Sequence, residues 1–191
     1  VWLAEGGQNR EVVDMVTSLS EFFRTTLSGG KDFITIKEEM GHIESYLQIQ
    51  KIRYQDILDY EVALDKSLEE YRILKLTLQP LVENAVRYGV DKRGFRIINI
   101  SAETKEDAAV IAVTDHGSGI PDEVVRSLKA GQGKGVGLLN VHKRLQSLYG
   151  EEGGLQITVT ENGSRVAFRI PLGKIEDLGE PAAISAQGRA V

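Results

Sequence analysis

The sequence predicts an α/β fold preceded by a helical hairpin, and a change of hydrophobic period leads to this prediction. Apolar residues recur with a period of about 3.6 from residue 10 to about residue 55, whereas from residue 57 they alternate with a period of 2. After that change, strand and helix patterns follow one another and end in a β-hairpin. We therefore divide the chain into a helical region (1–56), an α/β domain (57–173) and a tail (174–191).

Length and composition restrict the class of protein. The chain has 191 residues, of which 41% are hydrophobic and 27% charged, so it can bury a full core. A net charge of -5, without a block of Lys and Arg, argues against a nucleic-acid partner. There is no apolar run of the ~18 residues that cross a bilayer, no signal-peptide pattern and no cysteine, so we expect a cytoplasmic location. Because the chain starts at Val1 inside an apolar helical pattern, we also expect a fragment of a longer protein.

Two amphipathic helices are predicted in the first region, over residues 10–28 and 35–55. Gly29 and Gly30 separate them, and Thr35 with Glu38 has the spacing of a capping box at the start of the second helix. Their apolar stripes are Val12, Val16, Leu19 and Phe23 in the first helix, widened by Met15 and Phe22, and Ile36, Met40, Ile43 and Leu47 in the second. Either a second copy of the chain covers these stripes, or the stripes pack on the following domain.

The α/β domain is predicted from shorter patterns. Leu74, Leu78, Leu81 and Ala85 mark a helix that Pro80 either begins or kinks. We expect strands at 58–64, 96–105 and 108–114, helices at 122–129 and 138–149, and a closing hairpin in which Leu155, Ile157 and Val159 face Val166, Phe168 and Ile170 across residues 161–164. Residues 174–191 have no periodicity and are expected to be a disordered tail.

An acid followed by two glycines comes at the end of the strand predicted over 108–114. Asp115, Gly117 and Gly119 place a carboxylate at the mouth of a cleft, and the glycines allow backbone to approach a flat ligand closely. Adenine fits such a site because its exocyclic amine donates to a carboxylate, whereas guanine presents an acceptor oxygen there. On its own, this motif is equally typical of a glycine-rich turn.

Two further motifs suit a nucleotide. Asn84 lies one helical turn from Arg87 and Tyr88, so one helix face offers an amide oxygen, a cation and a phenol. Mg²⁺ on a triphosphate needs few protein ligands, and a single Asn oxygen is sufficient. The glycine-rich segment Gly131–Leu138 leads into a helix and offers backbone amides and Lys134 to an anion, although it lacks the spacing of a Walker loop.

In this order, the motifs resemble the ATP-binding fold shared by DNA gyrase, the ninety-kilodalton heat-shock chaperone, mismatch-repair ATPases and sensor histidine kinases. Glu83-Asn84-Ala85 resembles the N box of that superfamily, and the segments 115–119 and 135–138 resemble its two glycine boxes. The amino-acid sequences of residues 44–54, 78–85 and 137–150 are similar to those of the LytS-type sensor histidine kinases. The resemblance implies a Bergerat-type two-layer α/β sandwich after part of a helical dimerisation hairpin.

The resemblance also implies functions for individual residues. Asn84 holds Mg²⁺, Asp115 binds the adenine amine within the first glycine box, and Glu83 is the candidate catalytic residue, at the position that activates water in the ATPases of this fold and that assists phosphoryl transfer in the kinases. The residues expected around the phosphates are Arg87, Tyr88, Gly133, Lys134, Gly135, Gly137 and Leu138. The partners implied are ATP, Mg²⁺, a response regulator and a second copy of the full-length protein, whose anchor is expected in the bacterial cell membrane.

The chain departs from the family pattern in three respects. Tyr88 stands where these kinases usually have His, and His116 replaces a small polar residue. The phosphoacceptor His belongs to a motif just before the residues that resemble Val1, and that motif is absent, so we expect the acceptor upstream of this chain. The alternatives are an ATP-hydrolysing conformational ATPase of the same fold and a nucleotide-binding module without phosphoryl transfer.

Overall fold

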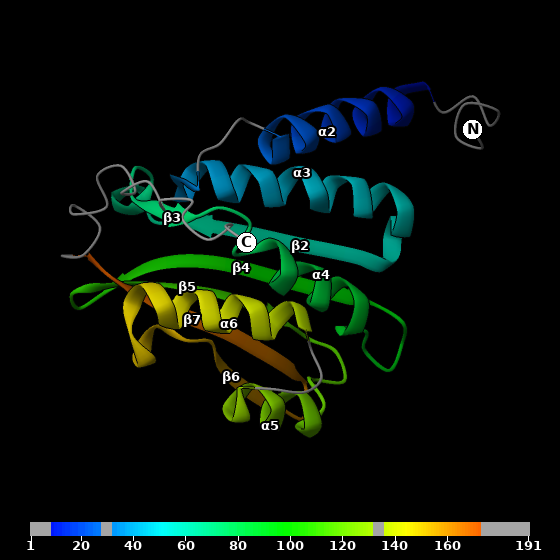
Figure 1. The fold of residues 1–191 in the computed structure, drawn as a ribbon. Helices are drawn as coiled ribbons and strands as arrows, with labels where there is room; N and C mark the ends of the chain where they lie inside the picture. The colour runs from blue at the N-terminus through cyan, green and yellow to red at the C-terminus, as the bar shows by residue number, and fades with distance from the viewer. Residues whose placement is uncertain (1–8, 28–31, 132–135, 173–191) are drawn as a thin grey trace, which may run out of the picture.

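The computed structural model describes residues 9–27, 32–131 and 136–172, and Figure 1 shows the arrangement of its helices and strands. The α-helices are α2 (Asn9–Leu27), α3 (Ile36–Tyr54), α4 (Gln79–Tyr88), α5 (Asp122–Ala130) and α6 (Val136–Tyr149). The strands are β1 (Phe33–Thr35), β2 (Leu58–Leu64), β3 (Arg72–Leu74), β4 (Arg96–Lys105), β5 (Ala108–Asp115), β6 (Gln156–Thr160) and β7 (Gly163–Pro171). The expected tail, 174–191, lies outside the described residues.

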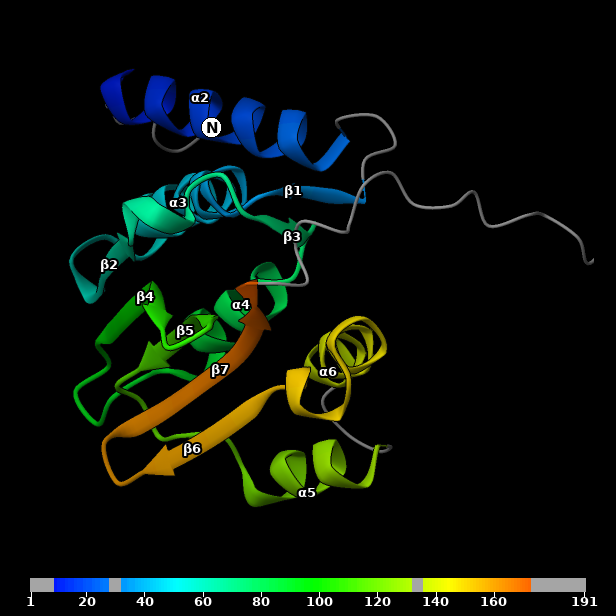
Figure 2. The ribbon, with the colours of Figure 1, turned by 90° about the vertical axis from the view of Figure 1, so that its left-hand side faces the viewer.

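A five-stranded sheet in the order β2-β4-β5-β7-β6 forms one layer, and helices form the other. The strands β2 and β4 are parallel, while the other neighbouring pairs are antiparallel. The helices α4, α5 and α6 lie on one face of the sheet, and α3 lies alongside β2 with α2 outside it (Figure 2). This arrangement confirms the predicted two-layer α/β fold with helices before the sheet.

The central strand β5 explains why the core lies on the helical side of the sheet. Its residues Ala109, Ile111 and Val113 alternate along one face, and Ile111 pairs with Phe168 of β7, which is fully buried. The opposite face carries smaller or polar residues such as Asn99, Ser101 and Thr114. One face of the sheet is therefore apolar and covered by helices, as in a two-layer sandwich.

The helix α3 begins as its sequence predicts and then packs on the α/β domain. The Thr35 hydroxyl accepts from the Glu38 N–H at 3.0 Å, and the Glu38 carboxylate accepts from the Thr35 N–H at 2.7 Å, so the capping box is confirmed. Its predicted stripe is buried at Ile36, Met40, Ile43 and Leu47 and belongs to the same hydrophobic cluster as the sheet. Of the two alternatives for covering these apolar stripes, packing on the α/β domain is therefore correct for this helix.

The helix α2 differs, because most of its predicted stripe faces outward. Val16, Leu19 and Phe23 are 57%, 41% and 50% exposed, whereas the buried Ser18 donates to Gln48 of α3 at 2.9 Å. None of the described helices is both long and apolar enough to cross a membrane. The domain boundary at residue 57 stays a prediction. That boundary places α3 in the helical region, although α3 shares a hydrophobic core with the sheet.

The helix α4 starts at Gln79, with Pro80 in its first turn, so Pro80 begins the helix and does not kink it. The prediction was wrong for Leu74, which ends β3 and pairs with Phe33 of β1. Both strands of this small sheet have only three residues, too few for a period-2 pattern to be recognised in the sequence.

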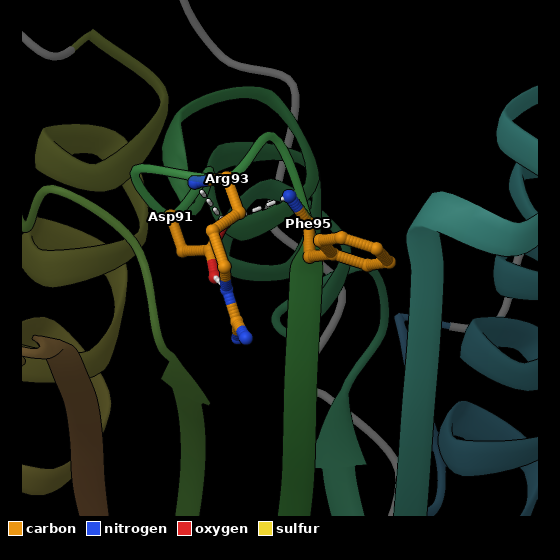
Figure 3. A network of polar contacts seen from close by, with 3 residues as sticks. All are labelled: Asp91, Arg93 and Phe95. Atoms are coloured by element: carbon orange, nitrogen blue, oxygen red, sulfur yellow. Dashed lines mark hydrogen bonds and ion pairs between the residues drawn. The ribbon is translucent and has the colours of Figure 1, made fainter.

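The loop between α4 and β4 is organised by one carboxylate (Figure 3). Asp91 Oδ1 accepts from the N–H groups of Arg93 and Phe95, both at 2.8 Å, and Oδ2 accepts from Arg93 Nε at 3.1 Å. The bond from Phe95 contributes most to a lowered pKa of Asp91. Because side-chain bonds of this kind fix turns, they hold the end of α4 in a defined place relative to β4.

The closing hairpin is confirmed, but its turn differs from the prediction. Ile157 pairs with Val166, whereas the expected four-residue loop would pair it with Phe168, and Val159 pairs with Ser164 and is 43% exposed on the edge strand β6. Gly163 pairs with Thr160 and therefore belongs to β7, which leaves Glu161 and Asn162 as the loop. Gly163 has a φ of 136°, and a Cβ there would overlap the Asp115 carbonyl, so glycine is needed for close strand approach.

Candidate functional site

A cleft of about 1040 Å³ opens between α3, α4 and the start of α6. Its described lining comprises Tyr46, Gln50, Arg53 and Tyr54 from α3, Pro80, Glu83, Asn84, Val86, Arg87 and Tyr88 from α4, and Ile120, Pro121, Glu123, Val124, Val136, Gly137 and Leu138. Its volume is at the upper end of the ~300–1000 Å³ typical of small-molecule sites, so a nucleotide can be accommodated.

The helix α4 contributes one wall because its two faces have different compositions. Leu81, Val82 and Ala85 point into the core, whereas Glu83, Asn84 and Arg87 face the cleft. Tyr88 also lines the cleft and is 49% exposed, with the Arg87 guanidinium 5.3 Å from the centre of its ring. The predicted N-box face therefore comes together on one helix.

The first turn of α6 meets the first turn of α4 at the cleft. Gly137 and the buried Leu138 line it, and a Cβ added at Gly137 would lie 3.7 Å from Pro80 Cβ. The N-terminus of each helix carries partial positive charge, which favours an anion between them. The predicted phosphate contacts Gly133, Lys134 and Gly135 lie outside the described residues.

Asp115 lies at the end of β5, next to the C-terminal end of α4. Its Oδ1 accepts from the Gly117 N–H at 3.0 Å, and its Oδ2 accepts from the Ser164 hydroxyl. Asp115 and Ser164 are both buried and are direct cross-strand neighbours. Asp115 is 6% exposed and is not part of the described cleft lining. Its carboxylate is held in place by these two donors.

Gly117 and Gly119 are both buried in the loop after Asp115. A Cβ on Gly117 would overlap the backbone of Gly89 and Val90, so the glycine is needed where this loop touches the end of α4. Gly119 has a φ of 80°, a left-handed conformation that favours glycine. The glycines thus bring two protein segments together, in addition to the close ligand approach expected from the sequence.

Gly117→Ala should lower the free energy of unfolding by about 1–3 kcal/mol, because the overlap must be relieved by moving backbone. Gly41→Ala is the matched control, since nothing lies within 4 Å of a Cβ on this exposed helical residue, and it should stabilise the protein by about 0.5–1 kcal/mol. Urea denaturation measures both. Equal stability of Gly117→Ala and the wild type would contradict the close approach.

The α3 wall of the cleft was missed from the sequence. Tyr46, Gln50, Arg53 and Tyr54 follow one another at i, i+4, i+7 and i+8, a spacing that places them on one helix face and could have indicated a polar wall. Burial, and to a smaller extent the negative charge of Glu83, raises the pKa of Tyr46 to about 12. The α3 wall therefore lies within electrostatic range of Glu83, the candidate catalytic residue. Ser164, the partner of Asp115, was also missed.

Each of the three histidines has a structural contact. His142 Nδ1 accepts from the Leu155 N–H at 2.9 Å, and desolvation lowers its pKa. His116 is exposed, with Nδ1 3.3 Å from the Ile97 carbonyl oxygen, and is not part of the cleft lining. His42 is buried and contacts Gln79. All three are explained by packing or surface contacts.

The cleft suits a metal that arrives with its own ligands. Within the described ranges, no group of three or more His, Asp or Glu side chains could hold a metal ion. Asn84 offers an amide oxygen on a half-buried, cleft-facing position. A magnesium ion there would take its other ligands from phosphate oxygens and water, which matches its preference for retaining several waters.

Two family models match this chain. The model described as "Histidine kinase" matches residues 1–58, and the model described as "Histidine kinase-, DNA gyrase B-, and HSP90-like ATPase" matches residues 69–174. The first match covers α2 and α3, and the second covers β3 through β7 with the cleft residues of α4 and α6.

Curated relatives and a solved structure agree with these matches. The chain is 34% identical to the sensor histidine kinase YesM of Bacillus subtilis over 172 residues, and 35% identical to the sensor protein LytS of Streptococcus agalactiae over 162 residues. These alignments cover 89% and 80% of this chain but only 29% and 27% of the relatives. The histidine kinase domain of a blue-light activated kinase from Erythrobacter litoralis has the same fold, with a TM-score of 0.57 at 18% identity over 87% of this chain and 79% of that domain.

Proposed function

We propose, because this chain belongs to the histidine kinase family, that it binds Mg-ATP in the cleft and donates the γ-phosphate to a histidine on a segment before residue 1. A response regulator would then take the phosphate from that histidine. The observation that carries this proposal is the convergence of Asn84, Arg87 and the α6 N-terminus on one cleft, next to the end of the strand that carries Asp115.

Each predicted site residue has a proposed function, whether it lines the cleft or, like Asp115, lies outside the lining. Asp115 accepts a hydrogen bond from the adenine amine, and Ser164 with the Gly117 N–H holds the carboxylate in place. Arg87, Tyr88, Gly137 and Leu138 are proposed to surround the phosphates, together with Gly133, Lys134 and Gly135. Since phosphoryl transfer depends mainly on positioning and electrostatics, these fixed donors would supply much of the rate.

Glu83 is proposed to act on the incoming nucleophile. It faces the cleft beside Asn84, and its carboxylate can accept a proton or a hydrogen bond from an imidazole N–H that approaches the γ-phosphate. A magnesium ion at Asn84, when bound, would neutralise phosphate charge. The nucleophile itself is proposed to lie on a segment before residue 1, because the three histidines of this chain have other contacts.

The same family supports proposals for the parent protein. The curated relatives are more than three times as long as the part that this chain matches, so a membrane anchor and a sensing region are proposed for the remainder. The exposed apolar side chains of α2 support a homodimer of the full-length protein through the helical region. The ATP-binding part would then lie in the cytoplasm.

Calorimetric titration with ATP tests the binding half of the proposal, and Asn84→Ala tests the metal. Wild-type protein should bind ATP more tightly with Mg²⁺ than without it. In Asn84→Ala this difference should disappear while the melting temperature stays within a few degrees, because a half-buried amide on a helix surface contributes little to stability.

Asn162→Ala is the matched control, since it removes an exposed amide from the hairpin loop outside the cleft. It should keep the full magnesium effect. An unchanged magnesium effect in Asn84→Ala would place the ion elsewhere, and the absence of ATP binding by wild-type protein would overturn the proposed function.

A further inference from the structure

We propose that His42 and Gln79 are positioning residues that fix the carboxylate of Glu83 for phosphoryl transfer. The proposal rests on the proposed function, because it assigns Glu83 a task in that reaction. The proposal starts from a series of hydrogen-bonded side chains that runs from the buried side of α3 to Glu83 in the cleft. The first two, His42 and Gln79, do not line the cleft and have no function assigned from the sequence motifs.

The three side chains are joined by two hydrogen bonds. His42 is 2% exposed on α3, and its Nε2 lies 2.9 Å from Gln79 Oε1 at the start of α4. Gln79 Nε2 donates to Glu83 Oε1 at 2.7 Å, one helical turn further along. A buried residue of one helix is therefore linked to a cleft-facing carboxylate of another.

The chemistry of these groups gives both bonds one direction. An ionised carboxylate only accepts hydrogen bonds, so the Gln79 amide must turn its NH₂ group toward Glu83. Its carbonyl oxygen then faces His42, which has to donate from Nε2. The arrangement thus requires a proton on Nε2 of His42 and leaves the second Glu83 oxygen for a group in the cleft.

A second buried residue of α3 holds the backbone at the start of α4. Glu39 is fully buried one turn before His42, and its carboxylate accepts from the N–H groups of Leu78 at 2.9 Å and Leu76 at 3.1 Å. Burial raises the pKa of Glu39, while these bonds act in the opposite direction. The helix α3 therefore fixes the backbone at the start of α4 as well as the side chain of its first residue.

This geometry matters because Glu83 is exposed, and an exposed glutamate otherwise samples several rotamers. A hydrogen bond from a restrained Gln79 selects the rotamer in which the carboxylate stays at the cleft wall. Small misplacements of a reacting group can lower a rate by as much as about 10²-fold. Loss of the His42 or Gln79 contact should therefore lower the rate of transfer without removing a nucleotide contact.

The test compares variants in the full-length kinase that carries this chain, with autophosphorylation kinetics as the readout. His42→Leu removes the donor, whereas His42→Gln replaces it with an amide N–H that can reach the same oxygen. We expect His42→Leu to lower kcat about tenfold, with KM for ATP changed less than twofold, and His42→Gln to recover most of the loss. Gln79→Met should resemble His42→Leu, and the double variant should be no slower than either.

A merely structural contact would give different results. It would lower the melting temperature while kcat of the folded variants stayed at the wild-type value, or it would give independent, multiplying losses in the double variant. Either result overturns the proposal, as does a failure of His42→Gln to recover the rate.

Nitrogen-15 spectra of the His42 ring in the 191-residue chain supply a measurement independent of activity. Wild-type protein should show the proton on Nε2, and a proton on Nδ1 alone would exclude donation to Gln79 and overturn the proposal. If the spectra agree but wild-type kinase transfers no phosphate, the proposed function fails and not the hydrogen-bonded chain.

Discussion

Asp115→Asn is expected to weaken ATP binding at least tenfold, which corresponds to about 1.4 kcal/mol, and to narrow the preference for ATP over GTP. Because the Gly117 N–H is a donor, the oxygen of the new amide must stay with it, and the NH₂ group then faces Ser164, whose hydroxyl can also accept. The substitution therefore keeps the loop in place. It nevertheless presents a donor to the adenine amine, which is itself a donor.

Calorimetry with ATP, ADP and GTP measures this change. Wild-type protein should bind ATP and ADP much more tightly than GTP, since guanine directs an acceptor oxygen at the carboxylate. Ser164→Ala serves as the matched variant, because it removes a partner of Asp115 but keeps the charge, and it should weaken ATP binding less than Asp115→Asn. Equal affinity of wild-type protein for ATP and GTP would refute adenine recognition by Asp115.

The longer elements could be predicted from the sequence because their periodicity and their end signals agree. The capping box at Thr35 and Glu38 and the proline in the first turn of α4 set helix starts that the structure reproduces. The strand β5 was found as an uninterrupted apolar run. Such signals are local, so they do not depend on knowing which segments meet.

What could not be predicted depends on contacts between distant segments. The α3 wall of the cleft exists only because α3 packs alongside the sheet and faces α4, and the pairing of Asp115 with Ser164 depends on the register of β5 against β7. The link from His42 to Gln79 joins residues 37 positions apart. Periodicity predicts on which face of a helix or strand a residue lies, but not which residue of another segment it contacts. These contacts could therefore be identified only from the structure.

The exposed side of α2 distinguishes it from α3. Its apolar residues Val16, Leu19 and Phe23 remain exposed, while the stripe of α3 is buried by the α/β domain. The two helices of the predicted hairpin therefore differ in the burial of their apolar residues. The outer helix leaves apolar side chains exposed, and the inner helix belongs to the core and carries residues that line the cleft and contact α4.

The 191-residue chain is expected to bind ATP but not to label itself with the γ-phosphate, whereas a longer chain with the upstream histidine should become labelled. Transfer requires the phosphate and an in-line nucleophile at the same time. His42 Nε2 lies 2.9 Å from Gln79 Oε1 inside the protein, and His142 Nδ1 accepts from the Leu155 N–H. His116 remains the strongest internal candidate, because it is exposed and adjoins Asp115.

His116 is nevertheless at the wrong end of the site. It follows the residue assigned to adenine, and it is absent from the cleft lining where Asn84, Arg87 and the α6 N-terminus would hold the phosphates. Incubation with γ-labelled ATP, followed by acid treatment that removes label from phosphohistidine, distinguishes the possibilities. Acid-labile label on the 191-residue chain that disappears in His116→Gln would show that the acceptor lies within this chain. Label that appears only when the upstream segment is present, and that persists in His116→Gln of that longer chain, is the expected result, because none of the three histidines of this chain is part of the described cleft lining.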